Sequence, residues 1–580
     1  MQLEVLKIIR KHSLLNAYKH DGKGEVGAVI GKVMGERSDM RTLAKELYPI
    51  VKEIVNEVNQ LSLNEQVSLL RAEFPDTIAE APKVEAEKKL PLLPGAERYS
   101  KIVTRFSPNP DCVLHLGSAR AIILSHDYAR KYGGKFLLRF EDTDPRLKKA
   151  SLVFYDLIKK DLDWLGCRWD EEYIQSDRIS TYYEVVEKLI KSNGAYVCTC
   201  DPSTFRGYLS SSIPCPCRNL AIEEQMNRWR MMLGEGYREG QAIVRVKTDL
   251  GHPNPAVRDW PALRIIDTTK HPHPRVGSKY RVWPLYNFAT GIDDHFMGIT
   301  HIIRGKEHIT NTVRQMYMYK HLGWEYPVAI HYGRLKIEGA VLSKSKIVQG
   351  VRDGLYEGFD DPRLATFLAL RRRGVLPDSI RKLIYDVGIK PVDVTISWQN
   401  LYSYNRQMVD KIASRYFAIV DNIELWIQGA KDHMKAVLPK HPEDKARGNR
   451  ELTVSWIDGV VKVLVSRSDM KLLLSNPIVR LMGLMNIGNV KPEDGHLRAI
   501  FKGFAVHEAR AARAPLIHWL PVRDLVKIFL LMPTGERLKG LAEKSLADEP
   551  VDSLVQLERI GFGRIDGKQD NEIVVYFTSR

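Results

Sequence analysis

A loop near residue 115 combines residue types that suit a phosphate group. Gly117 has no Cβ, so a ligand can approach the backbone closely, and the free N–H groups of a helix capped by Ser118 would favour an anion. His115 can donate a further hydrogen bond. From these residues alone, a loop histidine satisfied within the protein is the preferred interpretation. Neither a G-x-G-x-x-G nor a G-x-x-x-x-G-K-[ST] pattern is present, so neither a dinucleotide-binding fold nor a P-loop is supported.

A second loop of the same character follows an expected strand over residues 333–337. It reads Ser343-Lys344-Ser345-Lys346. Lysine binds phosphate as a point charge, and the small neighbouring residues leave the loop mobile. A solvated turn has the same composition, so this segment by itself does not assign a site.

Four of the six cysteines form two Cys-x-Cys pairs, Cys198 with Cys200 and Cys215 with Cys217. Two such pairs can supply four thiolates to one tetrahedral zinc ion, and four protein ligands leave no open position for catalysis. Disulfides are disfavoured inside a cell, and four unrelated buried thiols are the remaining alternative. The spacing predicts a structural zinc site.

Three histidines, His252, His271 and His273, also invite a metal interpretation. Two of them lie in the proline-rich run His271-Pro-His-Pro-Arg275. We interpret that run as an exposed loop rather than a metal site.

The elements around the first loop form a βαβ unit. A strand is expected over residues 101–106, a loop over 107–117, a helix from Ser118 and a second strand over 135–140. The helix ends at Gly133-Gly134, the residue type that adopts the left-handed conformation at a helix end. This order predicts a parallel sheet with a right-handed crossover, on which ligands bind beyond the carboxyl ends of the strands.

Composition indicates a soluble, basic protein of several domains. Of 580 residues, 44% are hydrophobic, and Lys plus Arg outnumber Asp plus Glu by 87 to 71, which gives a net charge of +16. Such an excess suits nucleic acid, although an ordinary basic surface would give the same count. We find no signal peptide or transmembrane span, so we expect a cytoplasmic protein without a membrane partner.

The two loops together resemble the signature motifs of class I aminoacyl-tRNA synthetases. His115-Leu-Gly-Ser118 is similar to H-I-G-H, and Val341-Leu-Ser-Lys-Ser345 is similar to K-M-S-K-S. Ser118 replaces the second histidine and Val341 the first lysine. Glutamyl and glutaminyl members of the family vary at both places, and Lys344 keeps the position that matters most.

Further segments narrow the resemblance to the glutamyl/glutaminyl subgroup. Thr104-Arg-Phe-x-Pro-x-Pro and Arg139-Phe-Glu-Asp-Thr-Asp144 are similar to those enzymes, and Arg304 stands where glutamyl enzymes carry arginine and bacterial glutaminyl enzymes an uncharged residue. The side-chain carboxylate of glutamate fits a guanidinium fork, whereas the amide of glutamine does not. Without the family, a salt bridge from Arg304 to a local carboxylate such as Glu307 would be the first interpretation.

The resemblance implies roles for individual residues. His115 and Lys344 would stabilise charge during catalysis. Glu141 would anchor the α-ammonium group of the amino acid. The residues assigned to the amino acid are Arg105, Glu141, Tyr286 and Arg304, and those assigned to ATP are Pro108, His115, Gly117, Ser118, Ser343, Lys344 and Ser345.

The fold implied is a multidomain α/β architecture with a Rossmann-like parallel-sheet catalytic domain that carries an insertion. A small helical domain precedes it, and a helical connecting domain and antiparallel β-barrels follow. Bacterial glutamyl enzymes end in helices, so the β-rich end resembles the archaeal type. The expected divisions are an N-terminal helical domain 1–76, a linker 77–97, a catalytic first half 98–195, an acceptor-end insertion with the zinc site 196–278, a catalytic second half 279–346, a connecting domain 347–395 and anticodon-binding barrels 396–580.

The activity implied is ATP-dependent ligation of glutamate to tRNA(Glu), with Mg²⁺ on the phosphates, transfer to the 2′-OH of the terminal ribose, and activation that requires tRNA. Whether tRNA(Gln) is also charged stays open, and we expect a monomer. The alternatives are a glutaminyl-tRNA synthetase, a synthetase-like RNA-binding protein without catalysis, and a simpler nucleotidyltransferase. The basic, β-rich C-terminal region argues against the last, because a small-molecule substrate gives that region no purpose.

Overall fold

The computed structural model describes residues 2–20, 22–74, 90–430, 434–457, 459–569 and 572–580. The chain divides into two compact units, Met1–Lys89 and Leu90–Arg580. Of the expected linker 77–97, residues 77–89 lie outside the described part. No helix within the described ranges is long and apolar enough to cross a membrane.

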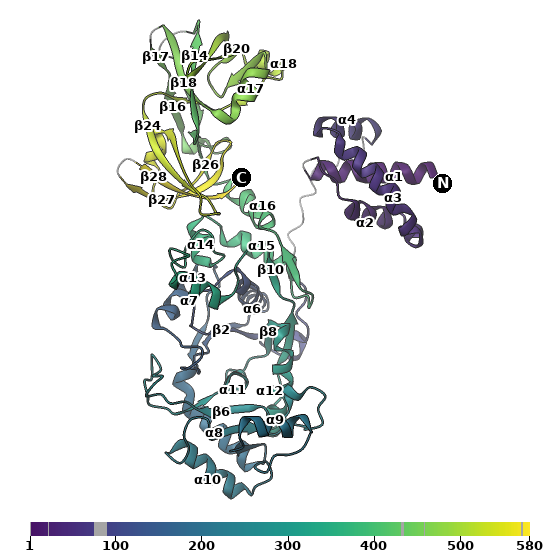
Figure 1. Ribbon diagram of the computed structural model, residues 1–580, viewed down its shortest axis with the longest axis vertical. Coiled ribbons are helices and arrows are strands. Elements are labelled where there is room, and N and C mark those ends of the chain that lie inside the picture. Colours follow the sequence, from purple (N-terminus) through teal and green to yellow (C-terminus); the bar gives the residue numbers. More distant parts are fainter. Residues whose placement is uncertain (1, 21, 75–89, 431–433, 458, 570–571) are drawn as a thin grey trace. The chain divides into compact units, whose positions relative to one another are not determined.

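The first unit is helical, as the sequence predicted for residues 1–76 (Figure 1). Its helices are α1 (Gln2–Lys19), α2 (Val26–Glu36), α3 (Ala44–Gln60) and α4 (Leu63–Glu73). Apolar residues of α1, α2 and α3 form a core of their own, which includes Val5, Ile9, Val29, Val33, Val51 and Val55.

The second unit is built on a parallel sheet, β1 (Val103–Phe106), β2 (Lys135–Phe140) and β3 (Glu171–Ile174). The helix α6 (Ala119–Lys131) connects β1 to β2. Gly134 must be glycine because a Cβ there would lie 1.9 Å from the carbonyl oxygen of Ile102. The βαβ unit is therefore present, although β1 begins two residues later than predicted.

Two further parallel strands, β8 (His301–Gly305) and β9 (Val328–Tyr332), belong to the same region as this sheet. Thr300, just before β8, exchanges hydrogen bonds with Val103, so β8 lies beside β1. The helix α7 (Leu152–Trp164) shares the apolar core of the parallel sheet, whereas α11 (Tyr286–Phe296) and α12 (Ile309–Leu322) contribute to a second core that includes strands of the insertion.

The insertion forms an antiparallel sheet whose strand order is β4-β5-β6-β7. Residues 282–289, which fall within the expected catalytic second half 279–346, divide between two elements. Only Val282–Pro284 is a strand, and it pairs with β6 of the insertion, whereas Tyr286 begins a helix. The elements are α8 (Ile179–Lys191), β4 (Ala195–Cys198), α9 (Pro202–Ser210), α10 (Ile222–Leu233), β5 (Ile243–Val246), β6 (Pro261–Ile265) and β7 (Val282–Pro284).

A mainly helical segment connects the parallel strands to the C-terminal sheets. The strands β10 and β11 pair in parallel, which joins the start of this segment to the residues just before its last helix, α16. Its elements are β10 (Leu335–Ile337), α13 (Lys344–Arg352), α14 (Phe367–Arg372), α15 (Pro377–Val387), β11 (Val394–Ile396) and α16 (Trp398–Val409).

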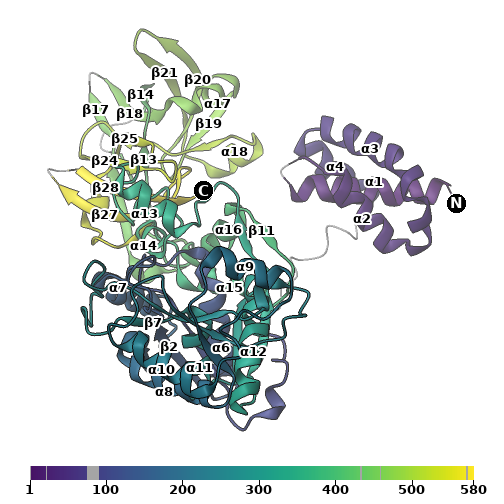
Figure 2. The same cartoon turned by 60° about the horizontal axis from the view of Figure 1, so that its bottom comes forward.

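The described C-terminal region folds into two curled, largely antiparallel sheets of seven and eight strands and a separate antiparallel pair, β15 with β16 (Figures 1 and 2). In the seven-stranded sheet the edge strands β12 and β13 are separated only by Phe417, so the two edges meet in a near-barrel. Four parallel pairs, such as β24 with β28, interrupt the antiparallel order. The elements are β12 (Ser414–Tyr416), β13 (Ala418–Ile419), β14 (Asn422–Gln428), β15 (Lys435–Pro439), β16 (Asn449–Thr453), β17 (Ser455–Ile457), β18 (Val460–Ser466), α17 (Met470–Ser475), β19 (Ile478–Leu481), β20 (Asn486–Glu493), β21 (His496–Gly503), α18 (Val506–Ala511), β22 (Leu516–Ile517), β23 (Leu520–Pro521), β24 (Leu525–Leu531), β25 (Arg537–Glu543), β26 (Leu554–Leu557), β27 (Gly561–Gln569) and β28 (Glu572–Ser579).

Candidate active site

A cavity of about 560 Å³ lies beyond the carboxyl ends of β1 and β2, where ligands bind on parallel sheets. Five of the residues predicted for the site line it, namely Pro108, Ser118, Glu141, Tyr286 and Lys344. Other lining residues were not predicted and include Asn109, Asp111, Asp144, Lys148, His308 and Arg314. The predicted residues that do not line the cavity are Arg105, His115, Gly117, Arg304, Ser343 and Ser345.

His115 caps the helical segment that leads into α6. Its Nδ1 accepts a hydrogen bond from the N–H of Gly117 at 3.1 Å, whereas Ser118, the cap that the sequence predicted, makes no capping hydrogen bond. Burial, together with the charge of Lys344, lowers the pKa of His115 to about 4. With Nδ1 accepting, the neutral ring carries its proton on Nε2, which is then free to donate to a ligand.

The His115 segment is held by a distant part of the chain. His115 forms an isolated antiparallel bridge with Thr366. The N–H of Leu116 donates to the carbonyl oxygen of Ala365 at 2.8 Å, and the N–H of Phe367 donates to that of Leu114 at 3.1 Å. The start of α14 therefore fixes the loop that carries the histidine.

Lys344, at the start of α13, reaches the loop that follows β1. Its Nζ donates to Oδ1 of Asp111 at 3.0 Å and to the carbonyl oxygen of Asn109 at 3.2 Å. The hydroxyls of Ser343 and Ser345 lie 3.1 Å apart and are outside the cavity lining. The structure thus brings the two predicted loops together through the lysine.

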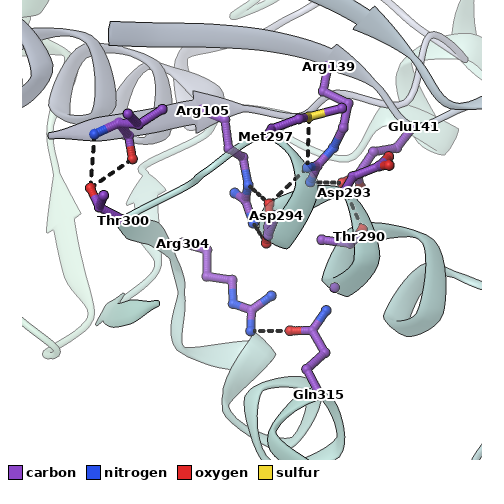
Figure 3. Close-up of polar contacts among 12 residues, drawn as sticks. Arg105, Arg139, Glu141, Thr290, Asp293, Asp294, Met297, Thr300, Arg304 and Gln315 are labelled. Atoms are coloured by element: carbon purple, nitrogen blue, oxygen red, sulfur yellow. Dashed lines mark hydrogen bonds and ion pairs between the residues drawn. The ribbon is translucent and has the colours of Figure 1, made fainter. Parts of the chain in front are cut away.

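Two arginines converge on one buried carboxylate (Figure 3). Arg105 of β1 donates to Asp294 of α11 from Nε at 3.0 Å and from Nη2 at 3.2 Å, and Arg139 of β2 donates to it at 2.8 Å. Burial would raise the pKa of Asp294, but the two guanidinium groups hold it below its usual range. Glu141 accepts from Arg139 at 3.0 Å and from Thr290 at 2.8 Å through the same oxygen, Oε1. Sequence reasoning missed the role of Asp294 as the partner of Arg105.

Arg304 of β8 uses only one of its three guanidinium nitrogens. Nη2 donates to Gln315 at 3.0 Å (Figure 3), and also to Thr312 at 2.6 Å and Tyr326 at 3.1 Å. Nε and Nη1 are buried and have no partner within the described chain. No ion pair to Glu307 or any other described carboxylate forms, so the local salt bridge weighed from the sequence is absent from this part of the protein.

The site also contains a neutral histidine beside these cations. Tyr286 places its hydroxyl 3.2 Å from Nδ1 of His308. Burial, followed by the charges of Arg304 and Arg105, lowers the pKa of His308 to about 4. The positive charges of Arg304 and Arg105 are therefore both felt at His308, and this part of the site suits a ligand with negative charge.

Comparison with known proteins identifies the family. Residues 101–411 match the family model of the tRNA synthetases class I (E and Q), catalytic domain. This chain is a class I tRNA synthetase of the E and Q group. Residues 413–501 and 516–566 of the synthetase match two anti-codon binding domain models of the same group.

Curated relatives extend over the whole synthetase. The chain is 50% identical to the glutamate–tRNA ligase of Thermococcus kodakarensis, with all of both chains covered. It is 49% identical to the glutamate–tRNA ligases of Pyrococcus furiosus and Pyrococcus horikoshii, again with full coverage of both chains. The resemblance drawn from the sequence motifs is confirmed.

The four clustered cysteines of the synthetase meet in the insertion. Their sulfur atoms all lie within 4.8 Å of one another. Sγ of Cys198 is 3.9 Å from that of Cys215, and Sγ of Cys200 is 3.7 Å from that of Cys217. A tetrahedral zinc ion with Zn–S bonds of about 2.3 Å places its sulfur ligands about 3.8 Å apart, so the donor set fits that ion.

The histidine-rich run of the insertion is not wholly exposed, which corrects the sequence interpretation. His271 and His252 are partly exposed, but His273 is buried. A bridge between His273 and Gly277 turns the run inward, and Nε2 of His273 lies 2.9 Å from the carbonyl oxygen of Asp142. His273 therefore supports the segment that follows Glu141.

Proposed function

We propose that this synthetase is a glutamate–tRNA ligase that activates glutamate with ATP and transfers it to tRNA(Glu). The curated relatives that it matches over full length carry that name. The observation that carries the choice of glutamate is Arg304, whose Nε and Nη1 are buried without a partner in the described structure. A side-chain carboxylate can take both nitrogens, whereas the amide of glutamine offers one acceptor and a donor that would face the cation.

The remaining site residues fit the other groups of the substrates. Glu141, which lines the cavity, would hold the α-ammonium group of glutamate, and Tyr286 borders the same space. Arg105 is engaged by Asp294, so it would contribute positive charge near the glutamate carboxylate rather than a direct fork. Pro108, Gly117 and Ser118 would face ATP.

Activation places the phosphates of ATP between His115 and Lys344. The α-carboxylate of glutamate attacks the α-phosphorus and pyrophosphate leaves, which requires positioning and charge stabilisation more than a protein base. Nε2 of His115 donates a hydrogen bond, and the ammonium group of Lys344 neutralises developing charge. Mg²⁺, when bound with ATP, supplies further positive charge on the phosphates. The 2′-OH of the terminal ribose of tRNA then attacks the acyl carbon of the adenylate, so that glutamate is transferred to the ribose and AMP leaves.

Aminoacylation tests this proposal directly. Purified tRNA(Glu) and tRNA(Gln) are each incubated with ATP and either glutamate or glutamine. We expect tRNA(Glu) to be charged with glutamate and neither tRNA to be charged with glutamine. Charging with glutamine would indicate a glutaminyl enzyme, and no charging or ATP–pyrophosphate exchange with any tRNA would contradict catalysis.

Substitution of the lysine tests the ATP site. Lys344→Ala should slow ATP–pyrophosphate exchange by roughly 10²-fold or more, since removal of one stabilising donor typically has that effect. Lys346→Ala is the matched control, because Lys346 is exposed two residues away and outside the cavity lining. A change below about threefold for Lys344→Ala would contradict the role.

The cysteine cluster is proposed to hold one structural zinc ion. Its geometry supports four thiolate ligands, which leave no open coordination position. Metal analysis of protein never exposed to a chelator should find about one zinc per chain. Cys200→Ser should lose the metal while Cys112→Ser, which replaces a buried cysteine outside the cluster, keeps it. Zinc-free wild-type protein would remove the proposal.

A further inference from the structure

Among the described residues, Asp111 is the one carboxylate that forms an ion pair with Lys344. The aspartate lies between β1 and His115 and lines the cavity together with the lysine. Its Oδ1 is 3.0 Å from Nζ, and the two side chains are 26% and 31% exposed respectively. Within the described chain neither group forms another ion pair, so each is the other's sole charged partner there.

This contact creates a competition in the ATP cavity. The phosphates of ATP and the carboxylate of Asp111 are both anions, and both suit the same ammonium group. His115 does not relieve the conflict, because its lowered pKa leaves it neutral near pH 7. When the phosphates reach Lys344, its contact with Asp111 must therefore be given up or shared.

We propose that Asp111 is a positioning residue that holds Lys344 over the cavity before ATP binds and is displaced by the triphosphate. The proposal rests on the proposed function, in which Lys344 binds the phosphates. Asp111 then stabilises the nucleotide-free enzyme and weakens ATP binding by the free energy of its ion pair with Lys344. It makes no contribution to the chemical step, because Lys344 has already left it.

Because Asp111 would hold Lys344 only in the nucleotide-free enzyme, its removal should change the KM for ATP and leave kcat nearly unchanged. Asp111→Asn keeps the shape of the side chain and removes its charge. The KM for ATP in ATP–pyrophosphate exchange should fall about two- to fivefold, the range that a partly exposed ion pair supports, while kcat stays within twofold. Asp111→Glu keeps the competing charge, so its KM should lie near that of the wild type.

A matched control and a double variant isolate the contact. Asp393→Asn removes one carboxylate from another partly exposed lysine pair, with Lys306 at 2.8 Å, away from the cavity lining, so its KM for ATP should not change. In a Lys344→Ala background, Asp111→Asn should no longer lower KM, because the competitor has lost the cation for which it competes.

Three outcomes would overturn the inference: an unchanged or higher KM in Asp111→Asn, a fall in kcat beyond threefold, or an equal fall in KM in the Lys344→Ala background. The test is separable from the proposed function. If wild-type protein activates no amino acid, titration calorimetry with ATP alone still compares the wild type with Asp111→Asn, and a Kd for the variant that is not lower rejects the positioning role.

Discussion

Arg304 illustrates how one side chain can be half satisfied by its own protein. One nitrogen is tied to α12 and neighbouring residues, which orients the guanidinium plane, while Nε and Nη1 stay buried without partners in the described structure. A buried cationic donor without a partner is costly. These two nitrogens therefore support the proposal that Arg304 binds the side-chain carboxylate of the substrate.

Substitution of Arg304 should act on glutamate rather than on ATP. Hydrogen bonds to charged groups contribute about 1.5–3 kcal/mol, so Arg304→Gln should raise the KM for glutamate roughly 10- to 100-fold in ATP–pyrophosphate exchange. The KM for ATP should change little. Arg334→Gln is the control, because Arg334 is 62% exposed beside Glu307. An unchanged KM for glutamate would remove Arg304 from the pocket.

Asp161 of α7 gives a prediction that depends on pH. The residue is buried, one carboxylate oxygen has no described partner, and burial raises its pKa to about 7 against a partial lowering by the N–H of Leu114. Between the unfolded pKa near 4 and this value, the folded chain holds a proton that the unfolded chain has released. Stability from this group therefore falls as pH rises through that window.

Asp161→Asn removes this titration. The variant should gain melting temperature relative to the wild type on going from pH 5 to pH 8, because only the wild-type chain has a carboxyl group that ionises on unfolding but is held neutral in the fold. Thermal unfolding at both pH values measures the difference. A gap between variant and wild type that is the same at pH 5 and pH 8 would contradict the assignment.

At the scale of elements, the short helix α14 joins the catalytic loop to the C-terminal sheet. Its N-terminal side pairs with the His115 segment through Thr366, and Thr578 of β28 donates to the carbonyl oxygen of Arg373 at its other end. Gly374 then turns the chain with φ of +82°, and a Cβ there would lie 2.6 Å from Cδ2 of Leu554.

The crowding at Gly374 can be separated from its backbone conformation. Gly354 also has a positive φ, +71°, but a Cβ there meets nothing within 4 Å. Both alanine variants lose about 1–2 kcal/mol for the left-handed backbone, and Gly374→Ala loses about 1–3 kcal/mol more through overpacking. Gly374→Ala should therefore melt at a clearly lower temperature than Gly354→Ala. Equal melting temperatures of the two variants would show that Leu554 of β26 moves to make room for the added methyl group without a loss of stability.

Sequence patterns predicted elements better than the contacts between them. The strand β2 and the turn at Gly133-Gly134 follow from local residue choice, and both are present. Val282–Pro284 was misplaced because a strand of three residues carries too little pattern to name its partner. The burial of His273 depends on a turn closed by Gly277, and the engagement of Arg105 depends on α11, so neither is visible in the local sequence.

At the scale of the molecule, all residues of the candidate site lie in the second unit. The first unit has its own apolar core, and the described residues that line the cavity all belong to the second unit. A shortened protein of residues 90–580 should therefore fold and keep ATP–pyrophosphate exchange within about threefold of the full chain, since no catalytic donor is removed. Exchange assays on both proteins measure this. A loss beyond tenfold, with an unchanged melting temperature of the second unit, would place a contribution to activation in residues 1–89.

The bridge between His115 and Thr366 bears on how the enzyme is made. His115 leaves the exit tunnel of the ribosome long before Thr366 does, yet the backbone hydrogen bonds of Leu116 and Phe367 join these two segments. A nascent chain halted before Thr366 can contain β1, β2 and β3, but it lacks the segment that holds the His115 loop in place. If the proposed ATP site is correct, newly synthesised enzyme should acquire affinity for ATP late in translation, after the connecting helices have emerged.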